Sequence, residues 1–220
     1  MKRIPTALIL SLTFNCLHFA MIGQPHSLPL TLLKAAPVAF LAVYATGNAL
    51  KPSSWLLAAA LALGAAGDFA IVYQLQLGAA FFALGHICAM LLYARFPDHG
   101  LTATQKRMIL LLIPASIGLG MSFAPDIISA LSVGFYAAMV SGMAALALRS
   151  RFPRSLTGLG AVLFLLSDFL IFVSIGPWSH VSAAANAKIE SLNWVLYYGG
   201  QVLITLGGVK GLSVSSTRSS

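Results

Sequence analysis

The chain has 220 residues, of which 59% are apolar and only 8% are charged, whereas soluble domains average about 45–50% and about 25%. So few polar residues cannot cover a water-facing globule of this size, which excludes an ordinary soluble domain and makes lipid the expected solvent. The net charge of +8 comes from 13 Lys and Arg against only 5 Asp and Glu. Because the basic residues fall at the ends of apolar segments, they indicate membrane topology rather than nucleic-acid binding.

Eight apolar segments are long enough to span a bilayer as helices, which takes about 20 residues each. The first resembles a secretory signal, but no Ala-x-Ala cleavage site follows it, so we interpret it as a retained span. Tight breaks near residues 24–28 and 74–76 predict helical hairpins. In chain order, the expected spans are 4–23, 28–47, 54–73, 76–94, 106–123, 127–148, 155–175 and 190–210.

These spans predict one all-α transmembrane bundle over residues 1–212, followed by a disordered cytoplasmic tail over residues 213–220. No linker or low-complexity tract divides the chain. Residues 63–72 and 163–172 share Leu, Asp, Phe and Ile at the same offsets. Because an even number of spans separates the two runs, they favour a parallel 4+4 repeat over an inverted one.

The positions of the positive charges are consistent with eight spans. With a cytoplasmic N-terminus, the opposite face has only Lys188, and Lys34 lies within a span. Cytoplasmic loops carry an excess of Lys and Arg, so we expect both termini in the cytoplasm, and the short loops favour a bacterial cytoplasmic membrane. The expected cytoplasmic residues are Lys2, Arg3, Lys51, Arg95, Lys106, Arg107, Arg149, Arg151, Arg154, Lys210 and Arg218.

Ionisable side chains inside the spans mark the candidate site, because an acid at membrane depth is costly unless it is protonated, paired or facing a polar cavity. Four such residues come from four different spans. Counted along the helix, they lie roughly 8–15 Å from the non-cytoplasmic ends. They are Lys34, Asp68, His86 and Asp168.

The last span adds three polar side chains at comparable depth. Asn193, Tyr197 and Gln201 follow at four-residue spacing, which places them on one helix face. Glycines next to the ionisable residues, such as Gly64 and Gly67, allow close helix approach, so these faces are expected to point into the bundle. Any one of these polar residues alone is as well explained by packing between helices, but the set in one layer favours a functional site.

Several catalytic signatures are absent from the sequence. It has no GxSxG elbow, no HExxH helix and no Walker-type loop. Cys16 and Cys88 lie in apolar runs and are expected to be packed thiols. We expect no cofactor and no metal, with a metal held by Asp68, His86 and Asp168 as the alternative.

Several of these residues belong to motifs through which the chain resembles the YhhN family of lysoplasmalogenases from about residue 30 to residue 205. The motifs are a Gly-Asp followed by a Gly-His, a Ser-Asp, a Lys element that lacks the family's commoner adjacent Lys-Pro pair, and Tyr-Tyr-x-x-Gln. They comprise Gly67-Asp68, Phe81, Phe82, Gly85-His86 and Tyr93; Gly160 to Ser167-Asp168; Lys34 to Pro37; and Tyr197-Tyr198 to Gln201.

The resemblance implies hydrolysis of the vinyl ether bond of lysoplasmalogens to a fatty aldehyde and glycerophosphocholine or glycerophosphoethanolamine. Protonation of the β-carbon gives an oxocarbenium ion that water attacks, so the reaction needs a protonated acid and a nearby base. Burial and a second carboxylate both favour a carboxyl that keeps its proton. Asp68 and Asp168 are therefore the candidate acid and stabiliser or base, in either order, and His86 is a candidate to position water or relay protons.

Lys34 and Tyr197, with Asn193 and Gln201 beside them, are the candidates for contacts with the phosphate or glycerol. The expected partners are the lysophospholipid and the bilayer, without nucleic acid, and no protein partner follows from the sequence. A proton-coupled transporter of a small molecule or lipid is the competing interpretation, because internal repeats and acids at the midplane are typical of carriers. A lipid-binding protein without activity is the third.

Overall fold

The computed structural model describes residues 5–49, 52–175 and 183–217 and is all-helical over these ranges. The expected fold class is therefore confirmed. A π-helical turn, Arg154–Gly158, leads into the seventh helix. The α-helices of the described residues are α1 Pro5–Ala20, α2 Leu28–Gly47, α3 Ser54–Ala70, α4 Leu75–Ala94, α5 Ala103–Ser122, α6 Ile127–Leu148, α7 Leu159–Ile175 and α8 Ala183–Thr217.

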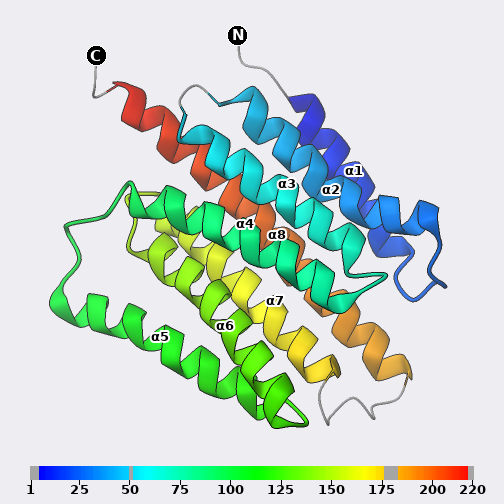
Figure 1. The fold of residues 1–220 in the computed structure, drawn as a ribbon. Helices are drawn as coiled ribbons and strands as arrows, with labels where there is room; N and C mark the ends of the chain where they lie inside the picture. The colour runs from blue at the N-terminus through cyan, green and yellow to red at the C-terminus, as the bar shows by residue number, and fades with distance from the viewer. Residues whose placement is uncertain (1–4, 50–51, 176–182, 218–220) are drawn as a thin grey trace.

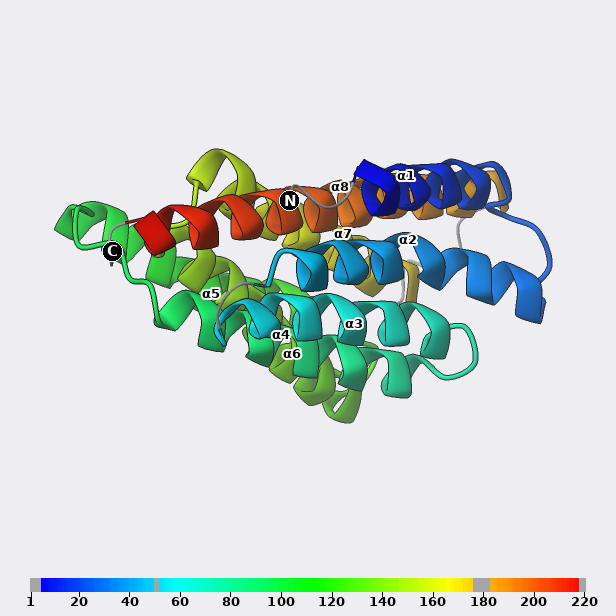
Figure 2. The same cartoon turned by 90° about the horizontal axis from the view of Figure 1, so that it is seen from above.

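The helices lie side by side in one bundle, and α1 begins at the same end at which α8 finishes (Figure 1). Sequence neighbours pack as pairs, while α4 also packs against α6, and α8 against α2 and α3. Seen from above, α1 and α8 lie next to each other (Figure 2). Hydrogen bonds join these two helices, from Trp194 Nε1 to Asn15 Oδ1 at 2.8 Å and between the hydroxyls of Ser11 and Tyr198 at 2.8 Å.

Several helix starts follow from local side-chain chemistry. Ser27 caps α2 by accepting a hydrogen bond from the Leu30 N–H, and Thr102 forms a capping box with Gln105 at the start of α5. Asp126 accepts the N–H groups of Ile128 and Ser129 at the start of α6. Such caps satisfy backbone donors that have no partner within the helix.

Four described segments are long and apolar enough to cross a membrane: Leu28–Gly47, Leu75–Ala94, Ile127–Leu148 and Arg154–Ser174. The apolar helices α1 and α3, at 16 and 17 residues, are shorter. The eight-span count and the 4+4 repeat stay predictions. The helix α8 continues through Thr217, so the described beginning of the expected disordered tail is helical, and residues 218–220 lie outside the described residues.

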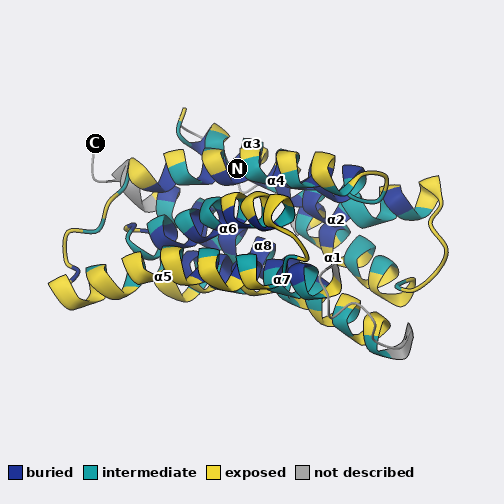
Figure 3. Ribbon diagram, turned by 60° about the horizontal axis from the view of Figure 1, so that its bottom comes forward, coloured by how far each residue is buried: buried dark blue, intermediate teal, exposed yellow. Residues whose placement is uncertain are grey.

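The outside of the bundle is apolar. Large side chains such as Ile128, Met108 and Phe135 are 75%, 67% and 66% exposed. Figure 3 shows exposed residues along most of α5, whereas α6 and α8 also carry many buried and half-buried residues. An apolar exterior of this kind, together with the membrane-length helices, identifies the chain as a membrane protein.

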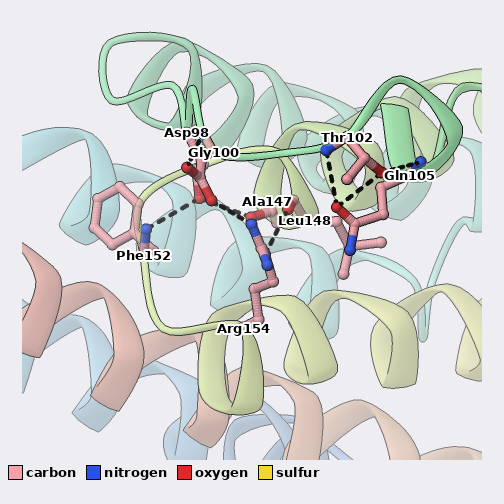
Figure 4. A network of polar contacts seen from close by, with 9 residues as sticks. Asp98, Gly100, Thr102, Gln105, Ala147, Leu148, Phe152 and Arg154 are labelled. Atoms are coloured by element: carbon pink, nitrogen blue, oxygen red, sulfur yellow. Dashed lines mark hydrogen bonds and ion pairs between the residues drawn. The ribbon is translucent and has the colours of Figure 1, made fainter. Parts of the chain in front are cut away.

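The loops between α4 and α5 and between α6 and α7 are fastened to each other at one end of the bundle (Figure 4). The Asp98 N–H donates to the Arg149 carbonyl at 2.7 Å, and the Arg151 N–H donates to the Phe96 carbonyl at 2.8 Å. Asp98 also forms an ion pair with Arg154. We call these five residues the basic-end clasp.

Most described Lys and Arg residues lie at the clasp end, as the topology analysis predicts, and Lys188 lies toward the other end of α8. Lys2, Arg3, Lys51 and Arg218 lie outside the described residues. The described bases at the clasp end are Arg95, Lys106, Arg107, Arg149, Arg151, Arg154 and Lys210.

Two glycines allow α7 and α8 to pack closely. A Cβ atom on Gly160 would lie 2.7 Å from the Gly200 carbonyl oxygen, and one on Gly200 would lie 2.7 Å from the Gly160 carbonyl oxygen. We predict that Gly160→Val separates the two helices and destabilises the detergent-purified protein by about 1–3 kcal/mol. Thermal unfolding measures this loss.

The control is Gly199→Ala on the partner helix α8, where a new Cβ atom would meet nothing within 4 Å. An equal loss in both variants would contradict the packing account.

Candidate active site

Asp168 lies two turns before the end of α7 and is buried, with 4% of its surface exposed. The Tyr136 hydroxyl of α6 lies close enough to interact with its carboxyl group. The second carboxyl oxygen, Oδ2, has no hydrogen-bond partner among the described residues. A buried oxygen without a partner is costly in a membrane, so Asp168 is a candidate for a functional role.

Asp168 lines a cavity of about 330 Å³, which we call the Asp168 cavity. Tyr136 and Phe82 lie beside it in the deep part of the wall, while Gln76 and Ser129 line the part near the helix ends. The rest of the wall is mainly aliphatic, and no lining residue is basic. The cavity volume lies within the range of about 300–1,000 Å³ of small-molecule sites.

Asp68, on α3, is held from the other side of the bundle. Its Oδ2 accepts a hydrogen bond of 2.7 Å from the Tyr197 hydroxyl, and Gln201 Nε2 lies 3.4 Å from the same hydroxyl. Lys34 is close enough to interact with the Asp68 carboxyl electrostatically. Asp68 therefore has the Tyr197 hydroxyl as a hydrogen-bond donor and the positive charge of Lys34 nearby. The residues that line the Asp168 cavity include hydrogen-bonding side chains but no Lys or Arg.

Two phenylalanines lie between the acids. The ring of Phe82 packs edge-on against Phe164 and Tyr197, with centroids 6.2 and 5.9 Å apart. A Cβ atom on Gly67 would lie 2.9 Å from the Phe82 ring, so only glycine next to Asp68 leaves room for it. We call Phe82 and Phe164 the aromatic wall. It gives the carboxyl groups of Asp68 and Asp168 different surroundings.

His86 is buried on the Phe164 side of this wall, with ring centroids 5.0 Å apart. It also packs against Tyr136 at 5.9 Å, and its Nε2 atom has no hydrogen-bond partner among the described residues. His86 and Gln201 line a second, inner cavity of about 30 Å³, which has room for at least one water molecule.

Of the four predicted substrate contacts, Lys34, Asn193, Tyr197 and Gln201, none lines the Asp168 cavity. Lys34 lines a different small cavity near the ends of α1 and α2, together with His18, His26 and Glu190. Asn193 donates a hydrogen bond of 2.6 Å to the Ser167 carbonyl, which joins α8 to α7. These two residues therefore do not share one cavity wall with Asp168.

Tyr136 is the site residue that sequence analysis missed. The available signal was a tyrosine in the middle of an apolar span, since a buried hydroxyl usually finds a hydrogen-bond partner. Identifying that partner requires knowing that α6 lies against α4 and α7, which the sequence does not contain.

A family model described as the YhhN family matches residues 30–208. The chain belongs to the YhhN family. The matched range begins in α2 and ends in α8, so it includes both aspartates, His86 and the walls of the Asp168 cavity. No curated protein and no solved structure matches the chain.

In the part of this YhhN protein that the structure describes, no group of three His, Cys, Asp or Glu side chains is arranged to hold a metal ion. Asp68, His86 and Asp168 therefore do not form the metal-binding set that the sequence left as an alternative. The arrangement instead offers one hydrogen-bonded acid, one partly unpartnered acid and one unpartnered imidazole, which together are suited to proton transfer.

The hydrogen bond from Tyr197 to Asp68 is testable through stability. We predict that Tyr197→Phe, which leaves a buried carboxyl oxygen without its donor, destabilises the protein by about 1–3 kcal/mol. Thermal unfolding in detergent measures the loss, and Tyr73→Phe at a 61% exposed tyrosine is the control.

Because both residues act in one contact, the double variant Tyr197→Phe with Asp68→Asn should lose less stability than the two single losses added together. Strict additivity would show that the 2.7 Å contact contributes no coupling.

Proposed function

We propose that this YhhN-family protein is an integral membrane lysoplasmalogenase, which hydrolyses the vinyl ether bond of 1-alkenyl lysophospholipids. The observation that carries the proposal is the Asp168 cavity, a space of about 330 Å³ lined by a buried aspartate that has one carboxyl oxygen without a partner among the described residues. Membership of the YhhN family supports the reaction class. The products would be a fatty aldehyde and glycerophosphocholine or glycerophosphoethanolamine.

Asp168 is the acid in this proposal. It lines the cavity, whereas Asp68 is held by Tyr197 beyond Phe82. Two carboxyl groups in different surroundings are the usual arrangement when one acts as the general acid and the other stays ionised and stabilises positive charge. Asp68, hydrogen-bonded to Tyr197, would then join α3 to α8 and contribute negative charge near the site. It would not contact the substrate.

The reaction balances with one water molecule. The Asp168 carboxyl gives its proton to the β-carbon, the π electrons of the double bond form the new C–H bond, and the ether oxygen stabilises the oxocarbenium ion. Water adds to the carbon next to the ether oxygen and returns a proton to the Asp168 carboxylate. The hemiacetal then loses the glycerol oxygen as an alcohol and becomes the aldehyde.

Tyr136 and His86 have defined places in this scheme. The Tyr136 hydroxyl lies close enough to interact with the Asp168 carboxyl, so it would donate a hydrogen bond to the carboxylate that remains after the first proton transfer and stabilise it. His86 lines the inner cavity, from which it would orient the attacking water or take its proton. We further propose eight spans with the clasp end in the cytoplasm.

Replacing the proposed acid tests the function directly. We predict that Asp168→Asn lowers aldehyde release from 1-alkenyl-glycerophosphocholine and -ethanolamine by about 10²–10⁴-fold, the usual contribution of a general acid. Asp126→Asn, at the exposed cap of α6, is the matched control and should keep full activity. No aldehyde from the wild-type protein, together with uptake of intact substrate into proteoliposomes, would favour the transporter instead.

The proposed hydrogen bond from Tyr136 predicts a smaller effect. Tyr136→Phe keeps the ring but removes the donor, so kcat should fall about tenfold, in keeping with about 1.4 kcal/mol for one hydrogen bond. KM should change little, because the missing interaction matters most after proton transfer. Tyr44→Phe on α2 is the control, and a fall in both variants alike would contradict a specific role for Tyr136.

A further inference from the structure

The Asp168 cavity opens toward one end of the bundle. Its deep residues, Phe82 and Asp168, are 7% and 4% exposed, whereas Gln76 and Ile128 near its rim are exposed. These rim residues lie in the first turns of α4 and α6. The opening is therefore at the helix ends opposite the basic-end clasp.

The clasp closes the other end. Phe152 is buried beneath it and packs edge-on against Tyr93 and Phe96, with centroids 5.5 and 5.6 Å apart. A Cβ atom on Gly211 of α8 would lie 2.5 Å from the Phe152 ring. Aromatic packing, two backbone hydrogen bonds and an ion pair thus seal the bundle between the inner cavity and the basic face.

We propose that the Asp168 cavity takes its lipid from the non-cytoplasmic leaflet and releases the head group to that side of the membrane. The proposal rests on the proposed lysoplasmalogenase function and goes beyond it by naming the leaflet. The side is set by charge, because the end rich in Lys and Arg is cytoplasmic and the opening lies at the opposite end.

The wall of the cavity also indicates how the lipid lies in it. Gln76, Ser129 and Ser132 line it with uncharged hydrogen-bonding groups, which suit a glycerophospho group with a zwitterionic head. The outer face of α6 next to the rim carries Ile128 and Phe135, both exposed and seven residues apart. The hydrocarbon chain therefore stays in the bilayer along α6 while the polar end occupies the cavity.

Thiol labelling tests the opening without relying on activity. In a background with Cys16→Ala and Cys88→Ala, three single variants are compared: Ser132→Cys in the cavity, Gln24→Cys between α1 and α2, and His99→Cys beside the clasp. Each is treated with a charged, membrane-impermeant maleimide in right-side-out and in inside-out vesicles, and the mass shift is measured.

We expect the maleimide to label Ser132→Cys and Gln24→Cys in right-side-out vesicles. It should label His99→Cys only in inside-out vesicles. Labelling of Ser132→Cys from the His99 side, or from neither side, would overturn the proposed opening.

Hydrolysis in the same vesicles tests the leaflet. Added 1-alkenyl-glycerophosphoethanolamine should release aldehyde at once in right-side-out vesicles, and in inside-out vesicles only after detergent is added. Equal initial rates in both vesicles would overturn the leaflet assignment. Absence of aldehyde even in detergent would instead contradict the lysoplasmalogenase function, and the labelling result would still decide where the cavity opens.

Discussion

In hydrocarbon, a polar atom can be satisfied only by another part of the chain, because lipid offers no hydrogen bonds. Many buried polar side chains of this protein meet that requirement, as the contacts from Tyr197 to Asp68 and from Trp194 to Asn15 illustrate. Oδ2 of Asp168 and Nε2 of His86 do not meet it among the described residues. Each of these two residues lines a cavity, whereas the hydroxyls of Tyr93 and Thr157, which also lack a partner among the described residues, line neither of these cavities. An unpartnered atom together with adjoining space marks Asp168 and His86 as the candidates for chemistry.

The aromatic wall explains how one bundle keeps two similar carboxyl groups in different roles. Phe82 and Phe164 pack between the helices that carry Asp68 and Asp168, and Gly67 makes the room that Phe82 needs. Asp68 is thereby tied to Tyr197, and Asp168 is left facing the open cavity. The same tight packing continues to the clasp end, which joins the two loops and leaves the bundle open on the opposite side.

Hydropathy and the polar residues at helix ends predicted much of the fold. The bounds of α2 and α6 agree with the predicted spans 28–47 and 127–148, because Ser27, Asn48, Asp126 and Arg149 mark their ends. Apolar length does not detect helix that continues beyond the membrane, so α8 reaches from Ala183 to Thr217 rather than over residues 190–210. The predicted span 155–175 agrees with the membrane-length segment Arg154–Ser174, whose first turn, Arg154–Gly158, is π-helical.

Composition and depth also identified Asp68, His86 and Asp168, since ionisable residues inside apolar segments are rare. Depth alone, however, does not specify which helices touch or which way each face points. It therefore grouped Lys34 with both acids, whereas the structure places Lys34 near Asp68 and in the wall of a cavity other than that of Asp168. It also missed Tyr136, whose position depends on the packing of α6 against α4 and α7, and it left open which aspartate is the acid.

The central claim is that a buried carboxyl protonates the β-carbon of a vinyl ether, and a single turnover in D₂O tests it most directly. The aldehyde is trapped by immediate reduction and analysed by mass spectrometry. The account predicts one deuterium on the carbon next to the former carbonyl with the wild-type protein, and no product with Asp168→Asn. Aldehyde without that deuterium, or undiminished deuterium incorporation by Asp168→Asn, would contradict it.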